Sequence, residues 1–516
     1  MRINSFEVRS VWKNLDGLKL DFDADREVTV VIGQNGAAKS NLLEAIITVF
    51  INIDLNEVSA FAYMMIYTIY GRSVRVVSEQ GKHPKSELDG KLVSLAELRA
   101  SWTPRYVVGY YSGVSDRFEE LFLKHDRKAL DETLVSTELT SSPQVLNLRR
   151  FICARPVHGL FALLAFYFSD DKLVVDFLKR HPRIEGFDSA LLVVRKPYWA
   201  KKDSKASDFW GAKGPVRDLL ERIQKYSLVP FSRTLSGKRD LRRLGKRELL
   251  YLYLPDINSL RSLAQEYGRE PRALFQALDT MRLSDLIEDF RVRVKVKGSK
   301  LPIHTRQLSE GEQQLLTVLG LMRFTRNEAS LYILDEPDTH LNPMWGVDYL
   351  QHLRRIGGIH RDSHTILATH HPLLVAGLLR EEIRVLSRSA GGQIRAFIPE
   401  ESPRGMGVAG VLTSPLYGLP SQLDSFSLKV LKRIYEISVL DSNEHRVRHI
   451  RRLRSLVPAV EMANGSPDPY RDIARDAYQL SLEKIVSSDE SIDKKVLAVE
   501  RLASMLYTRS FIGDGQ

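Results

Sequence analysis

Three short apolar runs in the sequence end in glycine or in polar residues, a pattern that predicts buried strands with functional groups at their tips. VTVVI (28–32) precedes the glycine-rich segment GQNGAAKSN (33–41), LYILDEP (331–337) ends in two acids, and HTILATHH (364–371) ends in a threonine and two histidines. NLLEAIITVF (41–50) follows the first run with the apolar spacing of a helix. We therefore expect an α/β domain whose strand tips meet at one edge of a parallel sheet.

Helical spacing of apolar residues dominates two other parts of the chain. Between the motifs it appears in FEELFLKHDRKALDETL (118–134), GLFALLAFYF (159–168) and VRDLLERIQKYSL (216–228), and near the C-terminus in FSLKVLKRIYEISVL (426–440), YRDIARDAYQLSLEKIV (470–486) and DKKVLAVERLASMLY (493–507). FRVRVKVKG (290–298) instead alternates cationic and valine positions, as expected of an edge strand with protective charges or of a ribbon that contacts DNA. No heptad pattern continues for several repeats, which argues against a long coiled coil.

The segment 33–41 nearly matches the phosphate-binding loop pattern G-x-x-x-x-G-K-[ST], except that Ala38 stands where the second glycine is expected. In such a loop, backbone N–H groups and the helix N-terminus face the phosphates, Lys39 supplies a cation and Ser40 can bind Mg²⁺. A left-handed backbone at Ala38 would cost about 1 kcal/mol. That cost is small enough for a working variant of the loop.

Two further segments supply the remaining parts of phosphoryl-transfer chemistry. Asp335 would hold Mg²⁺ through water, and Glu336 would orient or deprotonate the attacking water. In QLSEGEQQLLTVLGLM (307–322), Ser309 and Glu312 form an S-x-x-E capping box at the start of a helix, whose N-terminus is a second potential anion site.

The charge of the chain is concentrated in one stretch. The net charge is +11, and the segment between Arg195 and Leu250 holds 16 Lys and Arg residues against six Asp and Glu residues. A second basic cluster is RVRHIRRLR (446–454). Solvated helix faces and contacts with phosphate backbones remain equally open explanations. The candidates for contact with nucleic acid or a protein partner are Arg239, Arg242, Arg243, Lys246 and Arg247.

The composition of the chain limits the cellular compartments in which we expect it. Of 516 residues 43% are hydrophobic, and the single cysteine, Cys153, excludes an intramolecular disulfide and is expected to be a buried apolar residue. The longest apolar run, VSAFAYMMIYTIY (58–70), is shorter than a membrane span, and MRINSFEVRS lacks the apolar core of a signal peptide. We expect a soluble, cytoplasmic protein without a membrane partner.

The order P-loop, LSEGE, LDEP and a strand ending in histidine resembles the nucleotide-binding domain of ABC-type ATPases. The resemblance implies ATP and Mg²⁺ as cofactors, with two chains closing over two ATP molecules and the signature of each contacting the γ-phosphate held by the other. It implies Glu336 and His370 as catalytic residues, and Ser309, Gly311 and Glu312 as the signature. It implies Ser40 and Asp335 as metal ligands, and ATP binding by Gly33, Asn35, Gly36, Ala37, Ala38, Lys39, Ser40 and Asn41.

The motifs are far apart, because 275 residues separate Gly33 from Leu308. The predicted organisation is an N-lobe (1–113), a mostly helical basic insertion (114–287), a C-lobe with signature and switch histidine (288–395) and a helical C-terminal region (396–516). This interrupted head is similar to RecF-like and OLD-like ATPases. LSEGEQQLLTVLGLMRFT (308–325), LDEPDTHLNPMW (334–345) and RGMGVAGVLTSPLYGLPSQLD (404–424) further resemble the ATPases of restriction- and retron-associated phage defence, including the PtuA type of Septu systems.

The resemblance implies a homodimer or larger ring that controls a separate effector encoded nearby, often an HNH nuclease, with DNA or RNA as a possible partner. The chain itself is not expected to be a nuclease, because no D-x-D ends an apolar strand after His371. The alternatives are a RecF-like ATPase of DNA repair and, less favoured because of the large insertion, a transporter subunit. The Q-loop position stays open between Gln80, Gln144 and the YYSG turn (110–113).

Overall fold

The computed structural model describes residues 1–457 apart from 35, 136–148, 168–170, 239–243, 269, 327, 360–361, 390, 420, 422 and 439–443. The chain divides into two units, Met1–Leu419 and Pro420–Gln516, and each is described by itself. The predicted ATP-binding residue Asn35 and the two last predicted helices (470–486 and 493–507) lie outside the described residues.

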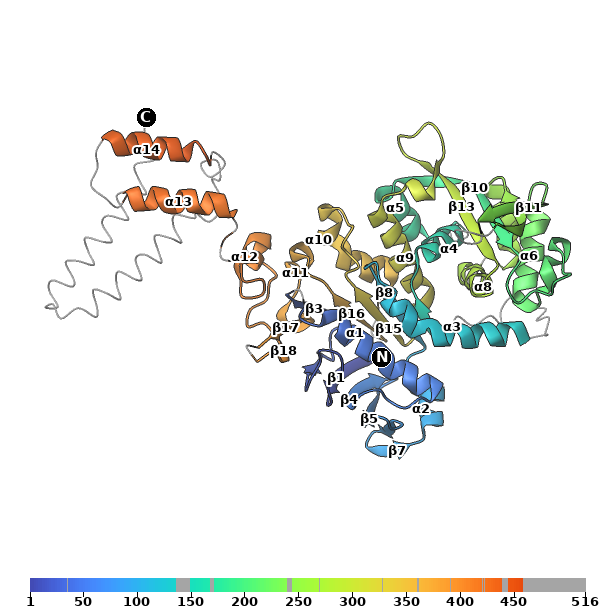
Figure 1. Ribbon diagram of the computed structural model, residues 1–516, viewed down its shortest axis with the longest axis horizontal. Helices are drawn as coiled ribbons and strands as arrows, with labels where there is room; N and C mark the ends of the chain where they lie inside the picture. The colour runs from blue at the N-terminus through green and yellow to red at the C-terminus, as the bar shows by residue number, and fades with distance from the viewer. Residues whose placement is uncertain are drawn as a thin grey trace. The chain divides into compact units, whose positions relative to one another are not determined.

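A seven-stranded sheet forms the centre of the first unit (Figure 1). Its strands are parallel except for the antiparallel edge strand β18. The strand before the P-loop, β3, lies beside β16, and β16 lies beside β15, so the three predicted strand tips are neighbours. In spatial order the strands are β18 (Ile394–Phe397), β17 (Ile383–Arg388), β3 (Val28–Gly33), β16 (Ser363–Ala368), β15 (Ser330–Asp335), β8 (Tyr106–Tyr111) and β9 (Phe151–Cys153).

A six-stranded antiparallel sheet and helix α1 cover one face of the central sheet (Figure 1). Alternate residues of β3 enter different cores, Val31 on this side and Val30 and Ile32 on the other, which explains why the whole strand is apolar. The elements of this layer are β2 (Lys19–Asp21), β1 (Arg2–Val8), β4 (Tyr63–Ile69), β5 (Arg72–Ser78), β6 (Lys85–Leu88), β7 (Lys91–Val93), α1 (Lys39–Leu55) and α2 (Leu95–Ser101).

Helix α9 (Glu310–Thr325) packs on the opposite face, together with α4 (Pro156–Phe166). The two helices approach closely, because a Cβ added at Gly320 would lie 2.3 Å from the Ala162 Cβ. The neighbouring elements of the first unit are η3 (Thr305–Gln307), α10 (Pro343–His352), η4 (Leu353–Gly357), α11 (Pro372–Val375), η5 (Arg380–Glu382) and α12 (Gly407–Thr413).

The region between the motifs contains the three helices predicted there, as α3 (Arg117–Val135), α4 and α6 (Gly214–Tyr226). The expectation of a mostly helical insertion nevertheless missed a five-stranded antiparallel sheet. Its strands are apolar on alternate positions, but they pair across up to 112 residues of sequence, from Ile184 to Val296, which no local pattern reveals. In spatial order they are β11 (Phe231–Lys238), β12 (Leu244–Leu254), β10 (Ile184–Arg195), β13 (Ile287–Val296) and β14 (Ile303–His304).

The remaining helices of this region are α5 (Lys172–Arg180), η2 (Ala206–Gly211), α7 (Ile257–Glu266) and α8 (Pro271–Leu283). The region is also not separate from the head. Strand β9 joins the central sheet through β8, and β13 crosses the expected boundary at residues 287 and 288. The sole cysteine, Cys153, is buried at the end of β9, and burial raises the pKa of its thiol to about 12, as expected of an unreactive residue.

The described part of the second unit is a pair of helices, α13 (Ser425–Ser438) and α14 (Glu444–Arg454). Ile450 and Leu453 of α14 pack on a small core that contains Val430, Leu431 and Ile434 of α13. Arg451, Arg452 and Arg454 are exposed. The basic cluster 446–454 is therefore one face of an amphipathic helix.

Candidate functional site

The P-loop follows β3 directly, and its backbone has the left-handed angles that the motif requires. Ala38 has φ 67° and ψ 20° at the start of α1, and no side chain caps this helix. Gly33 must be glycine because an added Cβ would lie 2.4 Å from the Leu386 carbonyl oxygen. Uncapped N–H groups in the first turn of a buried helix are a binding site for an anion. The loop thus accommodates Ala38 in the left-handed conformation that the motif requires of its second glycine.

Lys39 lies inside this loop and is only 7% exposed. Its Nζ donates a hydrogen bond of 2.9 Å to the Gly33 carbonyl oxygen. Burial lowers the pKa of Lys39, while Glu336 and Asp335 act in the opposite direction. The ammonium group is thus held over the loop, where an incoming phosphate would compensate for its lost hydration.

Asp335 ends strand β15 beside the P-loop and is 1% exposed. Burial raises the pKa of Asp335 to about 6, partly offset by a hydrogen bond from Ser40. The Asp335 Oδ2 atom is buried without a hydrogen-bond partner. One carboxylate and one hydroxyl are the protein ligands typical of Mg²⁺ that also binds phosphate and water. Ser40 and Asp335 therefore fit the metal that the sequence implies.

Glu336 and His370 face each other from adjacent strand tips. His370 Nδ1 lies 2.9 Å from Glu336 Oε1, and both side chains are partly exposed. Glu336 has φ 49°, a left-handed conformation that is unusual for a non-glycine residue, and its N–H donates to the Ala368 carbonyl oxygen. Strained backbone at such a position accompanies function in many enzymes. The hydrogen bond from His370 thus fixes the Glu336 carboxylate at the edge of the sheet.

A second pair behind these residues was not identified from the sequence. Asp338 is 2% exposed and accepts two hydrogen bonds from the Thr369 hydroxyl, of 3.0 and 2.8 Å. Thr369 N–H donates to the Val31 carbonyl oxygen, which ties the P-loop strand to the same pair. Asp338 follows the acidic strand tip by three residues, and this acid in LDEPDTH was the one available signal.

The signature segment forms the predicted capping box at the start of α9. Ser309 Oγ accepts from Glu312 N–H, and Glu312 Oε2 accepts from Ser309 N–H. Gly311 is required by packing, since an added Cβ would lie 2.4 Å from the His340 carbonyl oxygen. Ser309 is exposed, and among the described residues it makes no hydrogen bond to the P-loop. One chain thus presents the signature outward, apart from its own phosphate loop.

The YYSG turn lies beside the metal-binding position, whereas Gln80 is exposed between β5 and β6 of the antiparallel sheet and Gln144 lies outside the described residues. Tyr111 pairs with Asp335 in the sheet, and Ser112 N–H donates to the Asp335 carbonyl oxygen at 3.2 Å. Of the three Q-loop candidates, only the turn is seen next to the acidic strand tip.

The basic stretch is less free than its composition suggests. Arg247 pairs with Glu288 at 3.0 Å, and Arg195 pairs with both Glu288 and Asp285. Of the other four proposed contact residues, Arg239, Arg242 and Arg243 lie outside the described residues, as does the side chain of Lys246. Further ion pairs in this stretch involve Arg217, Arg222 and Lys225.

Two sequence comparisons give partial matches to known proteins. A family model described as "AAA domain, putative AbiEii toxin, Type IV TA system" matches residues 193–376. The Septu protein PtuA of Bacillus mycoides (strain KBAB4) is 26% identical over 164 residues, which is 30% of this chain and 22% of that protein. In sequence the chain is thus similar to AAA-domain proteins and to PtuA. The matched part spans about a fifth of the length of PtuA.

Solved structures with a similar arrangement include heads of chromosome-maintenance and recombination proteins. The SMC head domain from Thermotoga maritima is 12% identical, with 78% of this chain and 100% of that chain covered and a TM-score of 0.33. The recombination mediator protein RecF of the RecFOR pathway is 13% identical, with 77% and 98% covered and a TM-score of 0.29. No helix in the described part of the chain is long and apolar enough to cross a membrane.

Proposed function

We propose that the chain is the ATP-binding and ATP-hydrolysing subunit of a cytoplasmic anti-phage defence complex, in which ATP joins paired heads and controls a separate effector such as an HNH nuclease. The observation that carries the ATPase part is the Glu336–His370 pair across from the buried Lys39. The likeness to PtuA supports the defence role, because that relative is a Septu protein.

The residues of this chain divide the work of hydrolysis. The first-turn N–H groups of α1 and the Lys39 ammonium group bind the phosphates, and Mg²⁺, held by Ser40 and Asp335, would neutralise the charge that develops on them. The Glu336 carboxylate accepts a proton from the attacking water, and the hydrogen bond from His370 to its Oε1 atom orients it. Ser309 of a second chain completes the site at the γ-phosphate.

Mixed assemblies test the shared site. Lys39→Ala should abolish nucleotide binding at its own loop, and Ser309→Arg should leave nucleotide binding intact but prevent closure against the other head. Each variant alone should be inactive, while the two co-expressed should recover part of the hydrolysis rate, because a mixed pair keeps one site with both parts intact. If mixed pairs form by mass measurement but hydrolysis does not return, the shared site is rejected.

The effector is tested by co-purification. The protein product of the neighbouring gene should remain bound to the wild-type chain, and the retained amount should differ between ATP-trapped Glu336→Gln and nucleotide-free Lys39→Ala. Equal retention by both variants would contradict nucleotide control of the effector. Loss of all binding would contradict the complex itself while leaving the ATPase assignment in place.

A further inference from the structure

The five-stranded sheet between the motifs presents one face to the core and the other face outward. Leu250, Leu252 and Leu254 of β12 belong to the core, as do Leu192 and Val194 of β10. Because side chains alternate along a strand, the residues between them occupy the outer face. Besides Val193 and Leu249, which are buried, this outer face carries Phe231, Arg233, Tyr251, Tyr253, Leu191, Arg291, Arg293 and Lys295.

Aromatic rings lie together on this outer face. Phe231 pairs with Tyr251 across β11 and β12, and their rings are stacked with centroids 4.7 Å apart and an interplanar angle of 6°. Tyr253 lies one position further on the same face of β12 and pairs with Leu191. Phe231 is 52% exposed and Tyr253 is 37% exposed. Flat rings with open faces are the groups on which unpaired bases stack.

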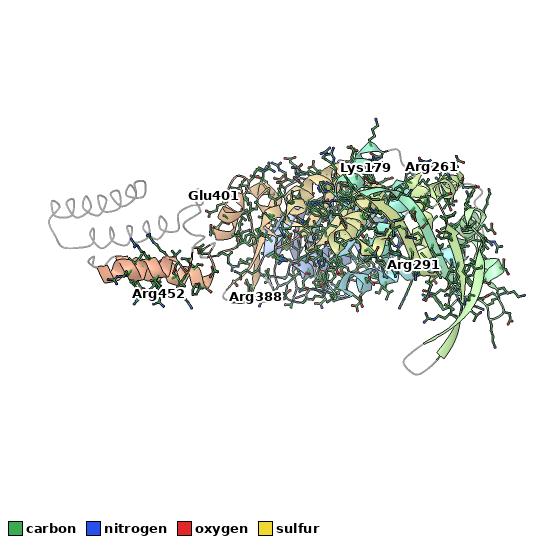
Figure 2. All side chains as sticks on the ribbon, turned by 90° about the horizontal axis from the view of Figure 1, so that it is seen from above. Lys179, Arg261, Arg291, Arg388, Glu401 and Arg452 are labelled. Atoms are coloured by element: carbon green, nitrogen blue, oxygen red, sulfur yellow. The ribbon has the colours of Figure 1, made fainter. Side chains whose placement is uncertain are left out.

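Cations flank the rings on both sides. Arg233 of β11 is exposed, and β13 contributes exposed Arg291, Arg293 and Lys295 (Figure 2, where Arg291 is labelled). Among the described residues, Arg233 and Lys295 form no ion pair, and Arg293 donates only to the Pro302 carbonyl oxygen. Burial lowers the pKa of the nearby His304, and the surrounding arginines lower it further against the opposing effect of Asp289.

The acids on this face do not cancel these charges. Asp289 is shared by Arg291 and Arg306, so one carboxylate faces two guanidinium groups. Among the predicted contact residues, Arg247 is the one whose side chain is described. It forms an ion pair with Glu288 at the same edge. The free cations therefore lie around the aromatic rings rather than at Arg247.

We propose that this outer face, with Phe231, Tyr251 and Tyr253 as the stacking surface and Arg233, Arg293 and Lys295 as phosphate contacts, binds single-stranded nucleic acid. The distance across strands β11, β12, β10 and β13 is roughly 14 Å from three inter-strand spacings, room for a short run of nucleotides. A duplex would not use the rings, because its bases are already stacked. The site is independent of ATP hydrolysis and would give the complex a means of sensing unpaired DNA or RNA.

Binding of fluorescein-labelled oligothymidylate and oligouridylate by the full chain, followed by fluorescence anisotropy, tests this site. The double variant Phe231→Ala with Tyr253→Ala should weaken binding about five-fold or more, as expected when a stacking ring is removed. Arg293→Ala should weaken binding and reduce its salt dependence. The two oligonucleotides distinguish DNA from RNA as the preferred strand.

Two control variants match these changes elsewhere in the same region. Tyr198→Ala removes an aromatic residue that is 74% exposed, and Lys179→Ala removes an exposed cation of α5 (Figure 2). Both should keep wild-type affinity, and all variants should keep wild-type ATP hydrolysis, which shows that they fold. Equal affinity of wild type and the aromatic variant, or tighter binding of a blunt duplex that the aromatic variant does not alter, would overturn the proposal. The proposal would also be overturned if the aromatic variant bound the oligonucleotides as the wild type does but lost a bound protein, since the face would then dock a protein.

Discussion

Helices α1 and α9 both begin at a predicted anion site, but they begin differently. The N-terminus of α1 has no side-chain cap and follows a residue in the left-handed conformation. The N-terminus of α9 is closed by its own Ser309 and Glu312 and is exposed. An uncapped, buried terminus requires a ligand to satisfy its N–H groups, whereas a self-capped terminus is stable while it waits for one. One chain thus has one helix N-terminus that no side chain caps and one that its own residues cap and that is exposed.

The two helices are also held by different parts of the molecule. Helix α1 lies in the core between the central and antiparallel sheets. Helix α9 packs on α4, which belongs to the region between the motifs, and His158 of α4 is bound there to Asp279 of α8 at 3.0 Å. The inserted region therefore supports the signature helix instead of extending from the head as an appendage. Changes at the contact between α4 and α9 should affect signature function and leave phosphate binding at α1 intact.

The largest expected effect comes from Glu336→Gln, which separates binding from hydrolysis at the α1 site. The amide keeps the shape but cannot accept the proton of the attacking water, so hydrolysis should fall about 10²- to 10⁴-fold. ATP affinity should be unchanged, because Lys39 and the N–H groups of α1 remain. Steady-state phosphate release and equilibrium nucleotide binding measure the two quantities. Glu401→Gln, at an exposed acid outside the nucleotide-binding motifs, is the matched control (Figure 2).

A second prediction concerns the support of α9 and depends on pH. His158 is fully buried, its Nδ1 accepts from Arg155 N–H, and burial lowers its pKa to about 4 in spite of Asp279. Between about pH 6.5 and 4 the unfolded chain binds this proton and the folded chain does not, so stability falls as pH falls through that window. The contribution is about 3 kcal/mol at its limit.

Urea unfolding of wild type and His158→Gln across that window measures this effect. The variant should be less stable at neutral pH but lose less stability on acidification than the wild type does. His83→Gln, at an exposed histidine in the loop between β5 and β6, should follow the wild-type curve. Parallel curves for wild type and His158→Gln would show that the histidine is not held neutral.

A third prediction concerns the contact between α4 and α9. Gly320→Val would force side-chain atoms into Ala162, since even the Cβ would lie 2.3 Å from the Ala162 Cβ. Overpacking of this kind costs about 1–3 kcal/mol and should displace α9. Hydrolysis should then fall while ATP binding at the P-loop persists. Gly186→Ala, at a position with nothing within 4 Å of the added atom, serves as control, and a parallel loss of ATP binding in Gly320→Val would refute separate support of the two helices.

The contrast between the two helices was partly visible in the sequence because both termini are encoded locally. The glycine and lysine spacing of 33–41 and the S-x-x-E box at Ser309 are properties of a few consecutive residues, and the structure contains both. Long-range pairings were not visible. The bond between Thr369 and Asp338, the pairing of β10 with β13 and the neutralisation of Arg195 by Asp285, 90 residues away, depend on the fold. For that reason the basic stretch looked freer, and the insertion more helical, than they are.

The smallest expected effect is that of Ala38→Gly, which restores the glycine that the P-loop pattern expects. Ala38 has φ 67°, so Ala38→Gly should relieve about 1 kcal/mol of backbone strain in the folded state. Glycine also increases the freedom of the unfolded chain by about as much, so the free energy of unfolding should change little. The informative quantity is ATP affinity. If the methyl group only strains the backbone, affinity and hydrolysis should stay equal or rise slightly; a several-fold rise in affinity would show that the methyl group obstructs the phosphate, and a fall would show that it helps to hold the loop in its binding conformation before ATP arrives.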